Sequence, residues 1–351
     1  MKEKFNIDNY VNGIKIEELN CFDRAIAAAA GGFNYYYYYY YALICAVEYN
    51  WSKLDFWVPH NDLNRWTTRN NRILNNLGLC MSQHKYKNSE EMIEIIQSSI
   101  HARMPVLVLI PYFSIPWDER YLNMEQRRAV HIFLITEYDS ANRTYIIRDD
   151  YMISQHNEDA LRFLNPNFNQ SLLWRYQIPE EYLISILDRS NEIGKMDNMY
   201  YANVLLTISS NDYEKETTHS TMIEYLHDFK YCIRESRLCE FVKNFNIEDE
   251  LKHQLKYKRS KFGVFRRNHI GSIITISKVV NILLRDNTIL ENGDVFGIAN
   301  EICEYRSKLL YKLQRNILKG QSLTEKEIFN IQGEICSFDN KLISFLKSIP
   351  K

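Results

Sequence analysis

Residues 20–32 read Asn20-Cys21-Phe22-Asp23-Arg24-Ala25-Ile26-Ala27-Ala28-Ala29-Ala30-Gly31-Gly32, and this stretch decides how the first part of the chain folds. Alanine is the strongest helix former and paired glycines end helices, so the stretch predicts a helix with Cys21 at or just inside its N-terminus. The free N–H groups and the positive dipole end at that position stabilise a thiolate and a developing oxyanion. Cys21 is therefore the candidate nucleophile, with a buried structural thiol as the alternative interpretation.

A run of seven tyrosines, Tyr35 to Tyr41, follows a turn at 31–34 and opens a second predicted helix over 35–50. Seven consecutive side chains on a helix point in all directions, so some of them face the core. Two interpretations are open: an amphipathic packing helix, and an aromatic wall against which a substrate stacks.

Farther along, apolar and β-branched segments predict three strands, at 104–110, 130–136 and 144–149. Turn residues at 138–143 join the second and third strands into an antiparallel hairpin. Two amphipathic helices precede this sheet, one over 62–77 and one from Ser89. The sequence after about residue 190 predicts helices only, at 219–243, 247–258, 270–286, 294–319 and 323–348.

We therefore predict an α+β protein with two domains. Residues 1–190 hold the antiparallel sheet, residues 191–351 form an all-helical domain, and the stretch from Asp188 to Gly194 is the expected boundary. Proline is absent from 180 to 349, which agrees with long uninterrupted helices.

The second and third predicted strands bring together two residues that could assist Cys21. His131 opens the second strand and Asp149 ends the third, so a hairpin of this length places both at one edge of the sheet. A cysteine nucleophile needs a base, and the base needs a group that orients its ring. If the helix at Cys21 packs against this edge, a Cys–His–Asp triad results. Taken singly, His131 is also compatible with a core histidine and Asp149 with a turn residue, and Asp150 is a rival for the third role.

The composition excludes several other classes of protein. The chain carries 43 Lys and Arg against 44 Asp and Glu, so bulk charge favours neither a nucleic-acid nor a membrane partner. Seven scattered cysteines, and a polar start that does not resemble a signal peptide, predict a cytoplasmic protein with reduced thiols. Apolar runs are too short to span a bilayer. We find no Gly-rich phosphate loop and no metal-ligand spacing, so we expect no bound cofactor or metal.

The chain order Cys, His, Asp resembles that of the papain-like superfamily, and within it the acyltransferase family typified by the butirosin-biosynthesis enzyme. The resemblance covers roughly residues 15–190 and rests on Asn20-Cys21-Phe22, Val130-His131-Ile132-Phe133-Leu134-Ile135-Thr136-Glu137-Tyr138-Asp139 and Tyr145-Ile146-Ile147-Arg148-Asp149. The chain departs from the family at Glu137, where Gly is usual, and at Asp150, where Pro is frequent. The fold implied by the resemblance is a papain-like cysteine-peptidase core followed by a helical C-terminal domain.

The activity implied by the resemblance is amide formation in antibiotic-type, thiotemplated biosynthesis. An acyl group would pass from the phosphopantetheine arm of an acyl or peptidyl carrier protein, through Cys21, to a small-molecule amine. The chain has no glutamine just before Cys21 to supply the papain-type oxyanion donor, so the candidates are the Cys21 N–H and the side chains of Asn20 and Asn12. The alternatives are a cysteine peptidase or amidase with the same triad, and a non-catalytic binding protein on the same fold.

A basic segment in the C-terminal half suggests where a partner binds. Between residues 251 and 267 there are seven basic residues and no acidic ones. Carrier proteins are typically acidic and phosphopantetheine carries a phosphate, so this segment is a candidate docking site; a solvated basic face is the equal alternative, and nucleic acid fits less well. The docking candidates are Lys256, Lys258, Arg259, Lys261, Arg266 and Arg267. Apolar faces in the helical half also make a homodimer an expectation.

Overall fold

The computed structural model describes residues 21–51, 62–118, 121–124, 129–149, 174–197, 201–210 and 319–348, together with Leu19, Met199 and short stretches between 241 and 316. The chain divides into two compact units. The first comprises Met1–Lys15, Asn20–Tyr41 and Trp57–Glu216, and the second comprises Ile16–Leu19, Ala42–Phe56 and Thr217–Lys351. Helix α3 (Tyr35–Trp51) therefore contributes residues to both units.

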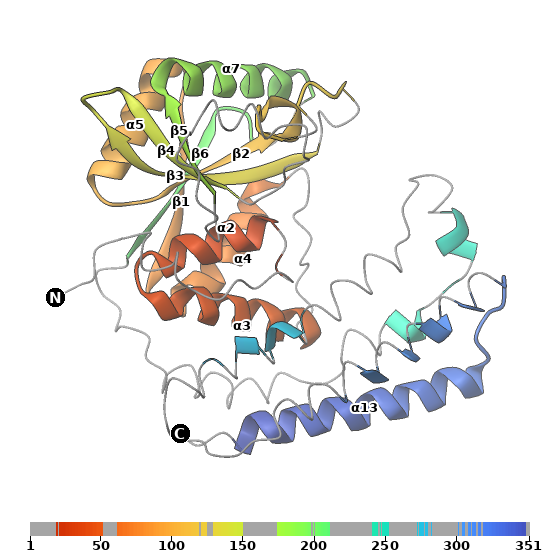
Figure 1. Ribbon diagram of the computed structural model, residues 1–351. Helices are drawn as coiled ribbons and strands as arrows, with labels where there is room; N and C mark the ends of the chain where they lie inside the picture. Colours follow the sequence, from red (N-terminus) through yellow and green to blue (C-terminus); the bar gives the residue numbers. More distant parts are fainter. Residues whose placement is uncertain are drawn as a thin grey trace. The chain divides into compact units, whose positions relative to one another are not determined.

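The first unit is built on an antiparallel sheet that has six strands among the described residues (Figure 1). Their order in space is β1-β6-β2-β3-β4-β5, and all five pairs of neighbouring strands are antiparallel. The strands are β1 (Leu79–Lys85), β2 (Val106–Pro111), β3 (Val130–Asp139), β4 (Thr144–Asp149), β5 (Trp174–Pro179) and β6 (Val204–Ser210). The α+β class with an antiparallel sheet is therefore confirmed.

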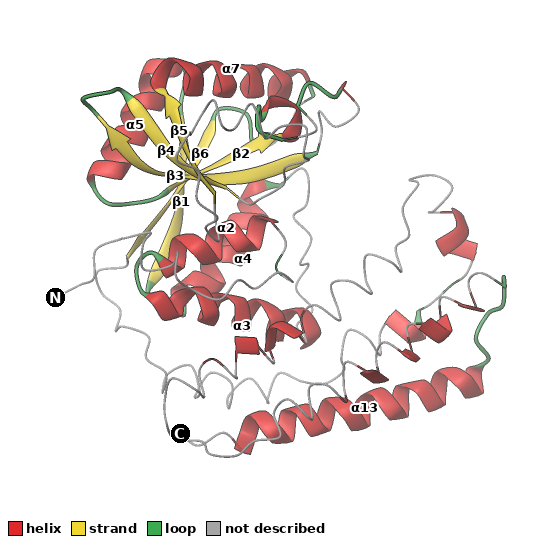
Figure 2. Ribbon diagram, viewed as in Figure 1, coloured by secondary structure: helices red, strands yellow, loops and turns green. Residues whose placement is uncertain are grey.

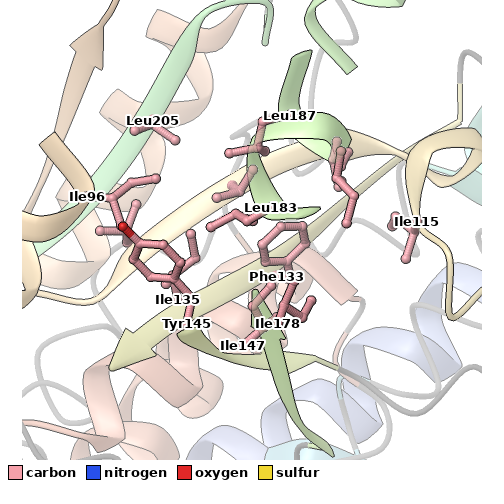
Figure 3. Close-up of a cluster of buried hydrophobic side chains, with 14 of the residues drawn as sticks. Ile96, Ile115, Phe133, Ile135, Tyr145, Ile147, Ile178, Leu183, Leu187 and Leu205 are labelled. Atoms are coloured by element: carbon pink, nitrogen blue, oxygen red, sulfur yellow. The ribbon is translucent and has the colours of Figure 1, made fainter. Parts of the chain in front are cut away.

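Helices α5 (Ser89–His101) and α7 (Glu180–Met196) cover one face of this sheet (Figure 2). Their apolar side chains pack with inward-facing strand residues such as Phe133 and Ile135 in one buried cluster (Figure 3). Each large apolar side chain removed from water contributes about 1.5–3 kcal/mol, so this cluster fixes the central strands firmly. Helix α2 (Cys21–Gly31) packs against β3, and α4 (Leu63–Asn75) packs against β1.

Most of the predicted elements of the first unit are confirmed, within a few residues. Helices α2, α3, α4 and α5, and strands β2, β3 and β4, lie where local sequence patterns place them. Gly78, which directly follows the helix predicted over 62–77, has a φ of +65° in the turn before β1. Glycine adopts this left-handed backbone angle without the steric cost of a Cβ atom, so the turn is favoured by the local sequence.

The prediction that the chain is helical from about residue 190 is wrong at β6, which joins the sheet between β1 and β2. Strands β1 and β5 were also missed, and the stretch from Asp188 to Gly194 lies inside α7 rather than in a linker. Short apolar runs are compatible with either a helix or a strand. Residues 204–210 form a strand because they pair with β1 and β2, which are distant in the sequence. No local pattern contains that information.

The regular structure in the described parts of the second unit is helical. Helix α13 (Glu325–Ser348) agrees with the helix predicted over 323–348. Its Ile331 and Ile335 share a buried cluster with Val242, Leu309 and Leu313. The other helices predicted beyond residue 218 lie wholly or mostly outside the described residues.

A buried polar network joins α2, α3 and α4 close to Cys21. Arg69 donates to Asp23 Oδ1 over 3.1 Å, and each of these side chains is 6% exposed. The Tyr41 hydroxyl lies 2.9 Å from Asn70 Oδ1 and 3.3 Å from Asp23 Oδ1. The tyrosines from Tyr37 to Tyr41 are all buried, which favours the packing interpretation of the tyrosine run.

Replacing Asp23 with alanine is expected to lower the free energy of unfolding by about 3–5 kcal/mol, because Arg69 stays buried without this counter-ion. Urea unfolding of Asp23→Ala, Arg69→Met and the double variant measures the effect. The double variant should lose less than the sum of the two single variants, since they remove the same interaction. If the free energy of unfolding of Asp23→Ala falls by less than about 1 kcal/mol, the Asp23–Arg69 pair contributes no more than an ordinary surface ion pair, which would contradict the prediction.

Candidate active site

Cys21 is the first residue of α2, where the alanine-rich pattern places it. Its side chain is partly exposed and its thiol is free. The alanines that follow are buried, and the helix ends at Gly31, where the Gly32 N–H donates to the Ala28 carbonyl over 3.1 Å. The sulfur therefore lies at the end of the helix where unpaired N–H groups and the positive dipole favour negative charge.

His131 and Asp149 are in direct contact, with 2.6 Å between Nε2 and Oδ1. They are only 2% and 3% exposed. Leu134 pairs with Arg148, so the register puts Asp149 beside Phe133 and places His131 two residues away on the same face. Diagonal neighbours of this kind are within reach of each other's side chains. A carboxylate can only accept hydrogen bonds, so Nε2 of His131 carries the proton that is donated to Asp149. Nδ1 is then the ring nitrogen that can interact with the Cys21 sulfur.

Two aromatic residues complete the surroundings of this pair. Trp117 donates its indole N–H to Asp149 Oδ2 over 2.7 Å, so both carboxylate oxygens receive a ring N–H. The Trp117 ring in turn stacks on Tyr176, with 4.8 Å between centroids. Tyr112 stacks on His131 at 4.8 Å and 23°, and its hydroxyl lies 3.9 Å from Cys21 Sγ. These contacts fix the orientation of both the carboxylate and the imidazole.

The electrostatic surroundings favour a charged imidazole ring. Burial lowers the pKa of His131, but the charge of Asp149, its hydrogen bond and the neighbouring Cys21 sulfur outweigh burial and hold the pKa well above its usual value. The Cys21 sulfur raises this pKa both through a hydrogen-bonding interaction with the ring and, to a smaller extent, through its charge. A thiolate beside an imidazolium is the nucleophilic form of cysteine.

Replacing Asp149 with asparagine is expected to lower the pKa of His131, because the carboxylate is the main group that raises it. NMR titration of the histidine rings measures this, and His84, whose pKa is lowered by burial, serves as the internal control. A raised folded-state pKa contributes stability below the unfolded pKa and loses it as pH rises through the folded value. The alkaline decline in stability should therefore be flatter in Asp149→Asn. An unchanged His131 titration would contradict this account of the pair.

The structure brings together the three residues that the sequence singled out as a triad. Asn12, Asn20 and Asp150 lie outside the described residues, and so do the docking candidates Lys256, Lys258, Arg259, Lys261, Arg266 and Arg267. Sequence reasoning missed Tyr112 and Trp117. Their signal was weak: an aromatic-rich connection, Pro111 to Asp118, that follows a strand next to the one carrying His131.

In the described part of the chain, no group of three or more His, Cys, Asp or Glu side chains is placed to hold a metal ion. None of the described helices combines the length and apolar character needed to cross a bilayer. No protein-family profile and no curated protein matches this chain.

Proposed function

We propose that this protein is a cysteine enzyme acting on acyl groups, with Cys21 as nucleophile, His131 as acid and base, and Asp149 as the group that orients His131. The observation that carries the proposal is His131 held between the Asp149 carboxylate, at 2.6 Å, and the thiol that begins α2. More particularly, we propose an amide-forming acyltransferase on a papain-like core, of the butirosin-biosynthesis type that the sequence resembles.

In the first half-reaction, the Cys21 thiolate forms a bond to the acyl carbon of a thioester. The carbonyl π electrons move to oxygen, and when the carbonyl re-forms, the bond to the leaving thiolate breaks. His131, protonated in the resting enzyme, gives its proton to that leaving sulfur. The products are an acyl-Cys21 thioester, a neutral His131 and a free thiol.

In the second half-reaction, an amine attacks the acyl carbon and loses a proton to neutral His131. The amide forms, the bond to sulfur breaks, and Cys21 leaves as the thiolate beside a protonated His131. The resting ion pair is therefore regenerated with no net gain or loss of protons. Asp149 stays ionised throughout and stabilises the imidazolium in both halves.

Transfer to an amine, rather than to water, is proposed from the resemblance to the acyltransferase family. His131 and Asp149 are 2% and 3% exposed, whereas Cys21 is partly exposed, so either acceptor would reach the acyl group from the sulfur side. Exclusion of water protects an acyl-enzyme from hydrolysis. Hydrolysis by the same triad is the second candidate, because the first half-reaction is identical and water would replace the amine.

The test uses acetyl-loaded acyl carrier protein as acyl donor. Intact-mass spectrometry should show one acetyl group added to the protein, and peptide mapping should place it on Cys21. Primary amines such as glycine and putrescine are then added, and liquid chromatography with mass detection measures N-acetyl product against free acetate. An adduct that yields only acetate favours the hydrolase, and the absence of any adduct favours a non-catalytic binding protein.

A further inference from the structure

A second polar group besides His131 faces the Cys21 sulfur. The Tyr112 hydroxyl lies 3.9 Å from Sγ with the geometry of a donor. Tyr112 is 6% exposed, and its ring stacks on His131 with 23° between the planes. A phenol hydroxyl is a hydrogen-bond donor, so this group can donate to negative charge that develops beside Cys21.

The backbone position of Tyr112 is set by the end of β2. Tyr112 begins the short 3-10 helix η1 (Tyr112–Ser114) directly after β2, and its N–H donates to the Ala129 carbonyl over 2.9 Å. Ile110 is the partner of His131 in the β2–β3 register, so Tyr112 comes two residues beyond that pair. A group anchored directly after a central strand is positioned more exactly than one in a long loop, which suits a group that must be in position before the reaction.

We propose that Tyr112 is a catalytic residue whose hydroxyl donates a hydrogen bond to the oxyanion formed when Cys21 attacks an acyl carbon. This inference rests on the proposed function and deepens it. The oxyanion is two bonds away from sulfur, so Sγ, the oxyanion and the Tyr112 hydroxyl can form a triangle in which the hydroxyl stays 3.9 Å from Sγ and reaches the oxyanion from the side. Donors that act on such an oxygen lie about 2.7–3.1 Å from it. Tyr112 would thus supply the donor for which the sequence offers no glutamine.

Only a hydrogen bond is involved, and Tyr112 keeps its proton. As the S–C bond forms, the carbonyl π electrons move to oxygen and the Tyr112 O–H bond points at the new charge. When the carbonyl re-forms, the leaving thiolate departs with the proton of His131. A donor that is stronger in the transition state than in the ground state accelerates the reaction, whereas equal binding of both does not.

The test separates this role from a simple interaction with the sulfur. Tyr112→Phe keeps the ring that stacks on His131 and removes only the hydroxyl. Two reactions of Cys21 are compared: acylation by S-acetyl-N-acetylcysteamine or p-nitrophenyl acetate, which passes through an oxyanion, and alkylation by iodoacetamide, which does not. We expect acylation to fall about 10²-fold, as for loss of one oxyanion donor, and alkylation to stay at the wild-type rate.

The matched control is Tyr138→Phe, which deletes a hydroxyl that donates to Glu180 over 2.9 Å near the other end of β3. It should leave both rates unchanged. Equal acylation by Tyr112→Phe and wild type would overturn the proposal, and so would a parallel fall in both reactions, because the hydroxyl would then act on the sulfur. Failure of wild type to acylate at Cys21 would instead reject the proposed function itself.

Discussion

A Cys21→Ala variant is expected to form no acyl adduct and to lose all turnover with acetyl-loaded carrier protein. The reason is chemical, because alanine has no sulfur to hold the acyl group between donor and acceptor. The fold should survive, since Cys21 is partly exposed at a helix end and alanine is a strong helix former. Intact-mass spectrometry measures the adduct, and thermal unfolding by circular dichroism confirms the fold.

Cys80→Ala is the matched control for that experiment. Cys80 is also a free, partly exposed thiol of the first unit, and its sulfur lies 3.2 Å from the Ser209 hydroxyl on the neighbouring strand. This variant should keep both the adduct and the turnover of wild type. Turnover at the wild-type rate by Cys21→Ala would reject the covalent mechanism, whatever the behaviour of the control.

A His131→Ala variant is expected to acylate Cys21 at least about 10³-fold more slowly than wild type, near the upper part of the range for general acid–base catalysis. Three functions disappear together: the positive partner of the thiolate, the proton donor to the leaving group, and the base for the amine. Asp149→Asn should cost less, because Asp149 orients the base and does not itself take part in bond making. The acetylation rates of wild type, His131→Ala and Asp149→Asn are measured in single-turnover experiments, with samples quenched and analysed by mass spectrometry.

Two further measurements distinguish loss of catalysis from loss of structure in His131→Ala. Imidazole added to the solution should restore part of the rate, since it supplies the missing acid and base. His84→Ala removes a partly buried histidine that contacts Thr207 on another part of the sheet, and it should acylate normally. A His131→Ala protein that is folded and acylates at close to the wild-type rate would exclude His131 from the mechanism.

The parts of the site that could be predicted depend on short-range interactions. Cys21 begins a helix because five of the next nine residues are alanine and two glycines follow. His131 and Asp149 meet because a hairpin joins them over 18 residues, and alternation along its strands puts both on one face. Local propensity and a single turn are enough to place each of these groups within its element.

Tertiary packing alone decided the rest. No local sequence pattern predicts that β6 enters the sheet between β1 and β2. Nor does any local pattern predict that Tyr112 stacks on His131 or that Trp117 donates to Asp149. Such contacts join residues far apart in the chain and depend on the shapes of whole elements. The sequence by itself therefore determined a helix that starts with a thiol and a hairpin that holds an imidazole and a carboxylate. Only the packed fold decided that sulfur, imidazole and phenol share one site, because long-range burial and not local propensity brings them together.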